Sequence, residues 1–450
     1  MKAANSEIFE NYPVPKALFT LALPMIIGQL IILIYNMADT FFIGRTNNPL
    51  MVAGVSLILP VFNITISFAG LFGLGGGTLI SRLLGVNKLE DAEKVSAFCF
   101  YMSIIIAGLF SLFTYLFMNP ILNLLGASSG TLKFASEYTF CVIVIGAVPT
   151  ILTMTLSNLL RSTGFSKYAG FGMAMGGILN IILDPIFMFV ILPQGSEALG
   201  AGIATMLSNF VSCIYFLIVL HKLGVKSSLS LSPFKGLPSS KNIKSVFFVG
   251  IPSALATFLF DLAYIIIDKL AASYGDTALA AIGIVLKAER LPLNIGIGIC
   301  MGMMPLAAYN YAAKNFKRMK ETVKFSRNVG ILTGFIAVIL YEIFAYYIMK
   351  FFISDSETVR IGTNFLRARC IATPFMFLCF HPLNFFQAVG KGYMALYLAV
   401  MRWAVFNIPM LYILNYFFGM YGIVWTQATA DILVALISYI HYRNFVKHMS

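Results

Sequence analysis

The sequence is poor in charged residues, and acidic residues are the scarcer kind. Of its 450 residues only 11% are charged, and just 18 are acidic against 31 Lys and Arg. Soluble proteins carry about 25% charged residues. Hydrophobic residues reach 59%, and the mean hydropathy is +0.87. The chain is therefore predicted to be an integral membrane protein with almost no soluble domain.

Clusters of reactive or metal-binding residues are also missing from the sequence. The six cysteines stand apart in apolar runs without CxxC spacing, and the four histidines are scattered. The paired Asp-rich motifs of a membrane prenyl transferase do not occur. The glycines at 73 and 75–77 lack the Lys-Ser/Thr of a phosphate loop, so close helix packing is their expected use. We expect no cofactor, no catalytic residue and no enzymatic activity.

What the sequence has instead is a series of long apolar runs. Each is long enough to cross about 30 Å of hydrocarbon as a helix. The first, with 21 uncharged residues from Leu18 to Ala38, is too long for the core of a cleavable signal. The expected fold is all-α, with twelve transmembrane helices near 17–42, 52–74, 96–117, 137–157, 168–191, 198–220, 245–267, 278–303, 328–349, 366–387, 394–416 and 420–441.

The two halves of the chain resemble each other. The matching residues include Pro24 and Pro252, Asp39 and Asp268, and Pro149 and Pro374. An internal repeat in an apolar chain is typical of transporters in which two lobes open a pathway alternately to each side. The predicted parts are an N-terminal lobe with spans 1–6 (1–220), a linker (221–244) and a C-terminal lobe with spans 7–12 (245–450).

The positive charge, +13 in total, is spread unevenly along the chain. With both termini inside, the inner segments hold 21 Lys and Arg residues and the outer loops hold 7, with Arg369 among the latter. Lys and Arg concentrate on the cytoplasmic side of membrane proteins. The bias predicts a multi-pass protein of the inner or plasma membrane with both termini cytoplasmic. It also explains the basic charge without a nucleic-acid partner, and we expect a monomer.

The predicted cytoplasmic ends of the repeat carry opposite charges. Acidic residues at 90–93 in the first half correspond to basic residues at 317–320 in the second half. Two interpretations stay open, a salt-bridged gate between the lobes or independently solvated helix ends. Exposed ion pairs contribute only about 0–1 kcal/mol, so both are physically reasonable.

Ionisable residues inside the predicted spans are the main functional signal, since each disfavours insertion by about 2.5–3.5 kcal/mol. Asp39 follows Tyr35 and Asn36 at helical spacing, so the three share one face of span 1. In span 5, Asn180 and Asp184 are also one turn apart. These side chains predict a site for a proton or a hard cation such as sodium. The alternative is structural, with Asp39 capping span 1 and Asp184 a satisfied buried acid.

The second half carries its own charged set. Asp261 and Asp268 share one face of span 7, and Lys287, Glu289 and Arg290 enter span 8. Their charges nearly cancel, which favours a structural ion network, and a coupling or drug-binding role stays open. Three further polar residues in apolar stretches receive no assigned role: His381, Glu342 and Asp431.

Three segments together carry a resemblance to a known family. They read N-M-A-D-T at 36–40, N-L-L-R-S-T-G at 158–164 and L-N-I-I-L-D-P at 179–185. With these segments the chain resembles a multidrug and toxic compound extrusion (MATE) transporter over essentially its whole length. The DinF-like and MepA-like branches of that family fit best.

The resemblance implies a V-shaped pair of six-helix lobes that exports organic cations, drugs included, against an inward flow of protons or sodium. In similar transporters the acids of spans 1 and 5 and the span 5 asparagine hold the coupling ion, which here are Asp39, Asp184 and Asn180. Thr205 in span 6 and Asn158 of the second segment are further candidates. Small organic cations and membrane lipids are the expected partners, and the coupling ion takes the place of a cofactor.

Two alternatives within the same superfamily bear on the second lobe. A NorM-like branch places acids in spans 7 and 10, and this chain has Asp261 but no acid from 371 to 387. A lipid-linked oligosaccharide flippase is the rival function, because such proteins use cationic residues in their cavity to hold a pyrophosphate. Lys287 and Arg290 keep this rival open, whereas the acidic charges of the first lobe argue against it.

Overall fold

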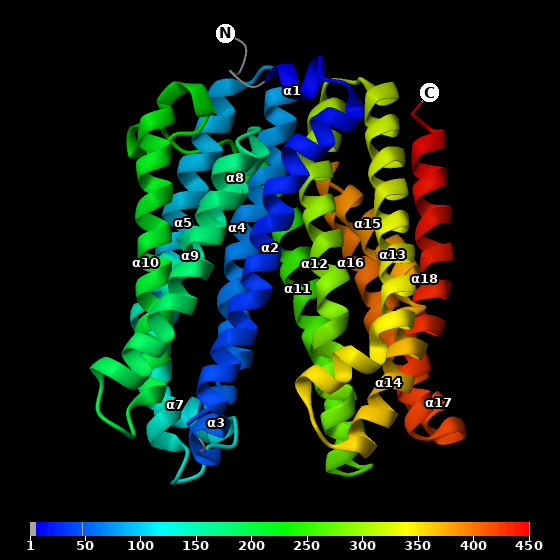
Figure 1. Cartoon of the computed structure of the whole chain (residues 1–450). Helices are drawn as coiled ribbons and strands as arrows, with labels where there is room; N and C mark the ends of the chain where they lie inside the picture. The colour runs from blue at the N-terminus through cyan, green and yellow to red at the C-terminus, as the bar shows by residue number, and fades with distance from the viewer. Residues whose placement is uncertain (1–5, 47, 450) are drawn as a thin grey trace.

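The computed structural model describes residues 6–46 and 48–449. That part of the chain folds into helices joined by short loops, with no β-strand. The long helices run roughly parallel in two bundles that lie side by side (Figure 1). Helix α1 (Ser6–Glu10) and the end of α18 (Met420–Lys447) lie at the same end of the molecule, called the terminal end below.

The first bundle contains the helices that follow α1, and wider π-helical turns interrupt one of its spans and end another. Its elements are α2 (Val14–Gly44), α3 (Pro49–Ser56), α4 (Leu59–Gly85), α5 (Leu89–Leu116), α6 (Met118–Leu124), α7 (Leu132–Thr139), η1 (Phe140–Ile145), α8 (Ala147–Ser162), α9 (Ser166–Ile186), η2 (Phe187–Ile191) and α10 (Glu197–Leu223).

A connection with two short 3-10 turns, η3 (Gly224–Ser227) and η4 (Pro233–Lys235), leads to the second bundle. The elements of that bundle are α11 (Ser240–Ala272), α12 (Asp276–Ala312), α13 (Phe316–Phe352), α14 (Ser356–Cys370), α15 (Thr373–Ala388), α16 (Gly392–Val400), η5 (Met401–Asn407), α17 (Ile408–Phe418) and α18.

The apolar helices account for almost all of the predicted spans. Within the described residues, ten helical stretches are long and apolar enough to cross a membrane, and an eleventh span is bent by 50° between Leu132–Ile145 and Ala147–Ser162. The predicted helix at 366–387 is wrong in its bounds. That region holds two helices, because α14 ends at Cys370 and α15 begins at Thr373, and α14 carries Arg367 and Arg369 in its last turn.

The bend before α8 and the break between α14 and α15 come at matching places in the two halves of the chain. Pro149 lies in the first turn of α8, directly after the bend, and Pro374 lies in the first turn of α15, directly after the break. Proline fits the first turn of a helix, where its missing N–H has no partner to lose. The repeat seen in the sequence therefore extends to the interruption of the fourth span in each bundle.

The two bundles are joined near the terminal end. The largest hydrophobic cluster takes Leu79 and Leu83 from α4 together with Met303 and Leu306 from α12, so it belongs to both bundles. Three other clusters each draw their residues from one bundle alone. The molecule is therefore closed at the terminal end, whereas toward the other end each lobe has its own core and the lobes diverge (Figure 1).

Glycines permit the close contact between the lobes. A Cβ atom on Gly302 of α12 would lie 2.6 Å from the Cβ of Ala22 on α2. Between α11 and α4, a Cβ on Gly250 would overlap the carbonyl oxygen of Leu71, and a Cβ on Gly75 would lie 3.2 Å from the Cα of Gly250. Small residues let helix backbones approach in this way. The expected packing role of the glycine-rich stretch is confirmed at Gly75.

The first described residues, around α1, pack across this closed end. Arg318 of α13 donates to the carbonyl oxygens of Phe9 and Tyr12, both at 2.6 Å. The Tyr309 hydroxyl of α12 donates to Glu10 Oε1 at 2.6 Å. These contacts attach the segment around α1 to the second lobe.

The acidic residues at 90–93 do not form a salt-bridged gate with the basic residues at 317–320. Glu90 pairs with Lys94 of its own helix at 2.7 Å, and Glu93 pairs with Lys235 of the linker at 2.8 Å. No ion pair joins the two segments within residues 6–46 and 48–449. Of the two interpretations left open, the gate is not formed in this conformation.

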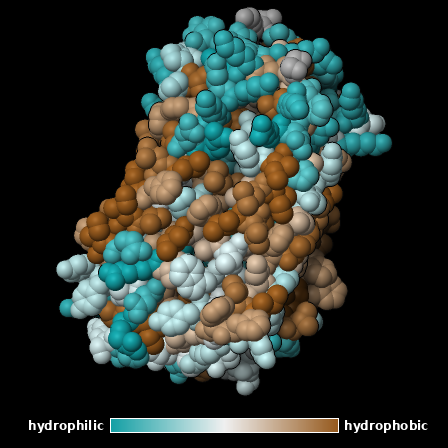
Figure 2. All heavy atoms as spheres, turned by 90° about the vertical axis from the view of Figure 1, so that its right-hand side faces the viewer, coloured by the Kyte–Doolittle hydropathy of each residue, from teal (hydrophilic) through white to brown (hydrophobic). Residues whose placement is uncertain are grey.

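The surface of the second lobe shows how the molecule meets the membrane. Figure 2 looks onto this face, where a hydrophobic belt crosses the middle of the molecule and a hydrophilic cap covers the terminal end. Exposed apolar residues of this lobe include Leu332 and Ile339 of α13 and Leu436 of α18. Large exposed apolar areas are typical of contact with lipid.

Candidate functional site

Close packing of α2 against α9 brings the candidate acids of the first lobe into one region. A Cβ atom on Gly177 of α9 would lie 2.7 Å from Cγ2 of Ile31 and 3.2 Å from Cδ1 of Tyr35, both on α2. The absence of a side chain at Gly177 therefore allows the face of α2 with Tyr35 and Asp39 to approach α9. This is the face that the sequence predicted to be functional.

Asn180 is the centre of the hydrogen bonds in this region. Its Nδ2 atom donates to Asp184 Oδ1 at 3.2 Å, one helical turn away, and to Thr205 Oγ1 of α10 at 3.3 Å. Asp184 is fully buried, and Asn180 and Thr205 are 3% and 7% exposed. The predicted spacing of Asn180 and Asp184 thus becomes a direct contact, and α10 completes it.

Three oxygen atoms in the same region lack a hydrogen-bond donor among the described residues. They are Asp39 Oδ1, Asn180 Oδ1 and Asp184 Oδ2, and all three are buried. Buried polar atoms without partners are uncommon in proteins and call for an explanation such as a missing ion or a transferable proton. Carboxylate and amide oxygens are the ligands that hard cations prefer. The first-lobe cluster, defined as Asp39, Asn180, Asp184 and Thr205, has the chemistry to hold a proton or sodium.

Tyr138 is a member of this region that the sequence did not indicate. It lies in α7, packs against α10 beside Gly202, and is within electrostatic reach of Asp39 and Asp184. Its helix precedes the bend of the fourth span, so its side chain meets α10 through tertiary packing. No local spacing rule relates it to the two acids, although a tyrosine inside an apolar span was a visible signal.

Two other candidates are not brought into the first-lobe cluster. Asn36 is exposed, and its carbonyl oxygen accepts a hydrogen bond from Thr40 at 2.9 Å. Asn158 donates to the Met154 carbonyl oxygen at 2.8 Å and accepts from Arg161 at 2.6 Å.

Arg161, the partner of Asn158, is itself only 4% exposed. It donates to the Met301 carbonyl oxygen of α12 at 2.9 Å. Asn158 therefore supports a contact between the two lobes rather than the cluster that holds Asp39.

The second lobe contains a buried ion network, whose membership differs from the predicted one. Glu289 of α12 pairs with Arg369 of α14 at 2.6 Å, and both side chains are nearly inaccessible. Asp431 of α18 pairs with Arg402 of η5 at 2.8 Å. Gln427 connects the pairs, since it donates to Asp431 Oδ2 at 2.6 Å and accepts from Arg369 at 3.4 Å.

This network gives Asp431 a structural role that the sequence left unassigned. The two carboxylates of the network, from Glu289 and Asp431, face two guanidinium groups, so the formal charges of the network cancel. Arg402 also lies 4.6 Å from the ring of Trp403, and Asn407 donates to Gln427 at 3.3 Å. A balanced and hydrogen-bonded set of this kind is tolerated in a low-dielectric interior, whereas an unpaired charge is not.

The other predicted members of the second-lobe set lie outside this network. Arg290 is exposed and lies over the rings of Phe260 and Tyr264 at 5.9 and 5.6 Å. Asp261 is half-buried and lies within electrostatic reach of Arg290. The two remaining members, Asp268 and Lys287, are exposed. Of the five predicted residues, only Glu289 belongs to the buried network.

The last two unassigned residues have local partners. His381 is 2% exposed, and its Nε2 atom lies 2.9 Å from the Ser326 hydroxyl of α13. Glu342 lies 3.7 Å from Arg367 at the surface. Both contacts join α13 to its neighbours in the same lobe.

The fold and the first-lobe cluster together define a class of protein. Two helical lobes joined at one end, with acids in the first of them that form no ion pair among the described residues, form the architecture of a membrane transporter. A model of the MatE family matches residues 24–186 and again 252–413, once in each half. The Multidrug export protein MepA of Staphylococcus aureus is 32% identical over 437 residues, which cover 97% of this chain and 95% of the relative. The chain therefore belongs to the MATE family, as the sequence motifs predicted.

Further comparisons agree with this assignment. The Multidrug export protein MepA of Staphylococcus haemolyticus is 30% identical over 439 residues, covering 97% of this chain and 95% of the relative. A crystal structure of MATE in complex with MaL6 superimposes with a TM-score of 0.93 at 22% identity, and it covers 100% of this chain and 99% of that one. The structure of an outward-facing multidrug resistance MATE family transporter of the MOP superfamily superimposes with a TM-score of 0.92, at the same identity and coverage. The all-α fold of two repeated lobes is confirmed.

Proposed function

We propose that this protein exports organic cations, including drugs, in exchange for protons or sodium. The observation that carries the proposal is the first-lobe cluster, where oxygens of Asp39, Asn180 and Asp184 are buried with no donor in the described part of the chain. The names of the relatives, multidrug export proteins, support the same function. The role is transport, and no enzymatic activity is proposed.

The coupling step follows from the chemistry of the two carboxylates. An ionised Asp39 or Asp184 attracts a cation, and a bound proton or sodium ion neutralises it. A neutral site no longer holds an organic cation, so loading from the outside favours release of the drug there. The driving force is ample, because one charge crossing 100 mV supplies about 2.3 kcal/mol.

The local structure of α2 and α9 suits a site that changes shape on loading. Pro24 interrupts the hydrogen bonds of α2, and Pro185 follows Asp184 directly, where α9 gives way to the wider turn η2. A proline inside a membrane helix frees a backbone carbonyl and marks a place where the helix bends. A change of charge at Asp184 therefore occurs next to the place where Pro185 allows α9 to bend.

We also propose that the terminal end faces the cytoplasm, so that the closed end described above makes this an outward-facing conformation. The support is the excess of Lys and Arg in the segments at that end. In a cysteine-free background, a cysteine at Gly236 in the linker is expected to escape an impermeant thiol reagent in intact cells and to react after lysis. A cysteine at Gly130 serves as the outer control, and labelling of position 236 before lysis would reverse the orientation.

A transport assay with substrates of opposite charge tests the proposed function. Membrane vesicles that contain the protein are given an inward or outward gradient of protons or sodium. We expect gradient-driven movement of ethidium and a quaternary ammonium compound, and none of an anionic dye of similar size. Selective movement of an anionic lipid-linked sugar, without transport of the cations, would favour the flippase. The basic residues of the buried network speak against that rival, because Arg369 and Arg402 are paired with acids.

A further inference from the structure

A pocket on the outer face of the second lobe has no part in the proposed transport site. It lies between α13, α15 and α18, and its volume is about 410 Å³, within the range of about 300–1,000 Å³ that ligand pockets occupy. Ile432, Leu436 and Tyr439, which follow one face of α18, are exposed. The pocket therefore opens away from the bundle, toward the surroundings of the hydrophobic belt.

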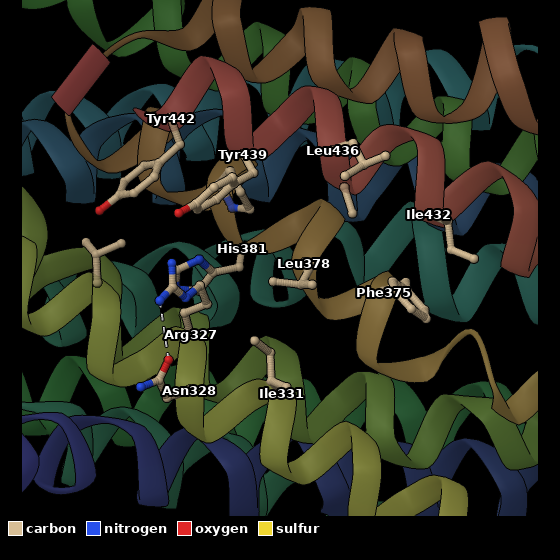
Figure 3. Close-up of a pocket in the computed structure, with 13 residues that line it drawn as sticks. Arg327, Asn328, Ile331, Phe375, Leu378, His381, Ile432, Leu436, Tyr439 and Tyr442 are labelled. Carbon is tan, nitrogen blue, oxygen red and sulfur yellow. Dashed lines mark hydrogen bonds between the residues drawn. The ribbon is translucent and has the colours of Figure 1, made fainter. Parts of the chain in front are cut away.

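The two ends of the pocket differ in polarity (Figure 3). Arg327, Tyr439 and Tyr442 gather at one end, and Ile331, Leu378 and Phe375 extend toward the other. Arg327 precedes Ile331 on α13, which starts at the terminal end, so the polar end of the pocket lies nearer the terminal end. An elongated pocket with a polar head and an apolar body fits an amphiphilic molecule.

The charge at the polar end is positive and has no anionic partner in the described residues. Arg327 contacts Asn328 Oδ1 at 3.5 Å and lies 5.9 Å from the ring of Tyr439, and neither contact neutralises it. None of the described residues that line the pocket is acidic. Lys324 and Arg443, both exposed, add positive charge nearby on the same helices. An anion is favoured at this end, and a cationic substrate is disfavoured.

Arg327 lies where the charged start of α13 gives way to a long apolar stretch. It is the last charged residue of the basic start of α13, and the next charged residue on that helix is Glu342. Tyr439 and Tyr442 stand at the same end of α18, where an apolar helix reaches its polar terminus. Arg, Lys and Tyr collect at the level of lipid headgroups in membrane proteins.

We propose that this pocket binds an anionic phospholipid from the leaflet at the terminal end. The phosphate accepts hydrogen bonds from the Arg327 guanidinium and from the hydroxyls of Tyr439 and Tyr442. One acyl chain lies along Ile331 and Leu378. A lipid in this position contacts three helices of one lobe, at a distance from the first-lobe cluster, so the proposal does not depend on the transport function.

Native mass spectrometry of the purified full-length protein tests this site. The probes are dioleoyl-phosphatidylglycerol and dioleoyl-phosphatidylcholine, which share their acyl chains, and glycerol phosphate as a headgroup without chains. We expect phosphatidylglycerol to be retained more strongly than the other two. Arg327→Gln is expected to weaken its retention by at least about fivefold, the effect of about one basic residue at a membrane surface.

Two further variants make the result specific to the pocket. Arg443→Gln removes one charge from the same end of α18, but Arg443 does not line the pocket, so retention of the lipid is expected to fall far less than in Arg327→Gln. Ala435→Phe fills the apolar part without altering the charge and is expected to lower retention. Each variant is first checked for folding by its melting temperature in lipid-free detergent. Equal losses in Arg327→Gln and Arg443→Gln, or equal retention of the two lipids, would overturn the proposal.

Discussion

Asp39→Asn is expected to abolish gradient-driven export of ethidium while the amount of protein in the membrane stays normal. Asparagine keeps the size of the side chain and its ability to accept a hydrogen bond, but it neither ionises nor balances a bound cation. The Oδ1 atom of Asp39 is buried and receives no hydrogen bond from residues 6–46 and 48–449, so this oxygen is available to bind the coupling ion. Asp184→Asn is expected to act in the same way, because Asp184 lies in contact with Asn180. Dye efflux from energised vesicles, normalised to protein content, measures the effect.

The repeat supplies a matched control for this experiment. Asp268 occupies the position in the second half that Asp39 occupies in the first, and it is exposed rather than part of a buried cluster. Asp268→Asn is therefore expected to reduce efflux far less. If Asp39→Asn exports dye at the normal rate and Asp261→Asn or Asp268→Asn does not, the coupling site belongs to the second lobe.

Asp431→Asn is expected to lower the stability of the second lobe sharply, and the melting temperature of the purified protein measures the loss. The substitution leaves the Arg402 guanidinium buried without its counter-ion and weakens the bond from Gln427. Breaking a buried ion pair on one side destabilises soluble proteins by about 3–5 kcal/mol. Glu357→Gln is the control, because it breaks an exposed ion pair in which the Arg360 side chain is 66% accessible and the Glu357 side chain 54%. Its effect on the free energy of unfolding should be about 0–1 kcal/mol.

A double variant separates loss of charge balance from loss of packing. Arg402→Met with Asp431→Leu removes both charges and keeps apolar volume, and such replacements of buried pairs are often neutral or stabilising. We expect it to recover most of the stability that Asp431→Asn loses. A double variant as unstable as the single one would mean that the hydrogen bonds to Gln427, rather than the ion pair, hold this region together.

The parts of the fold that the sequence predicted are those governed by local periodicity and by the repeat. The apolar runs marked the long helices, and the spacing of Asn180 and Asp184 indicated a contact one turn apart, which the structure contains. Both inferences use only the geometry of a single helix. They did not require knowledge of which helices are neighbours.

The parts that the sequence missed depend on tertiary packing. Tyr138 packs against α10 from another helix, and Glu289 and Arg369 are 80 residues apart in the chain. The charge count placed Arg369 with the outer loops and gave it no partner. In the structure it is 3% exposed, since an acid from α12 lies beside it. A charge pattern cannot reveal such a partner until the helices are placed.

The glycine contacts between the lobes bear on how the pathway opens. Gly302 meets Ala22, and Gly250 meets the backbone of α4. We call this glycine-lined contact between the lobes the seam. Much of the attraction across it therefore comes from dispersion between closely packed atoms. Such attraction is short-ranged, and a gap of 0.5–1 Å already removes about a quarter to a half of it. A seam of this kind has no stable half-separated arrangement, because the first small displacement removes much of what holds it. The two lobes should therefore part in an all-or-none step, and single-molecule distance measurements across the seam should show two populations rather than a continuum.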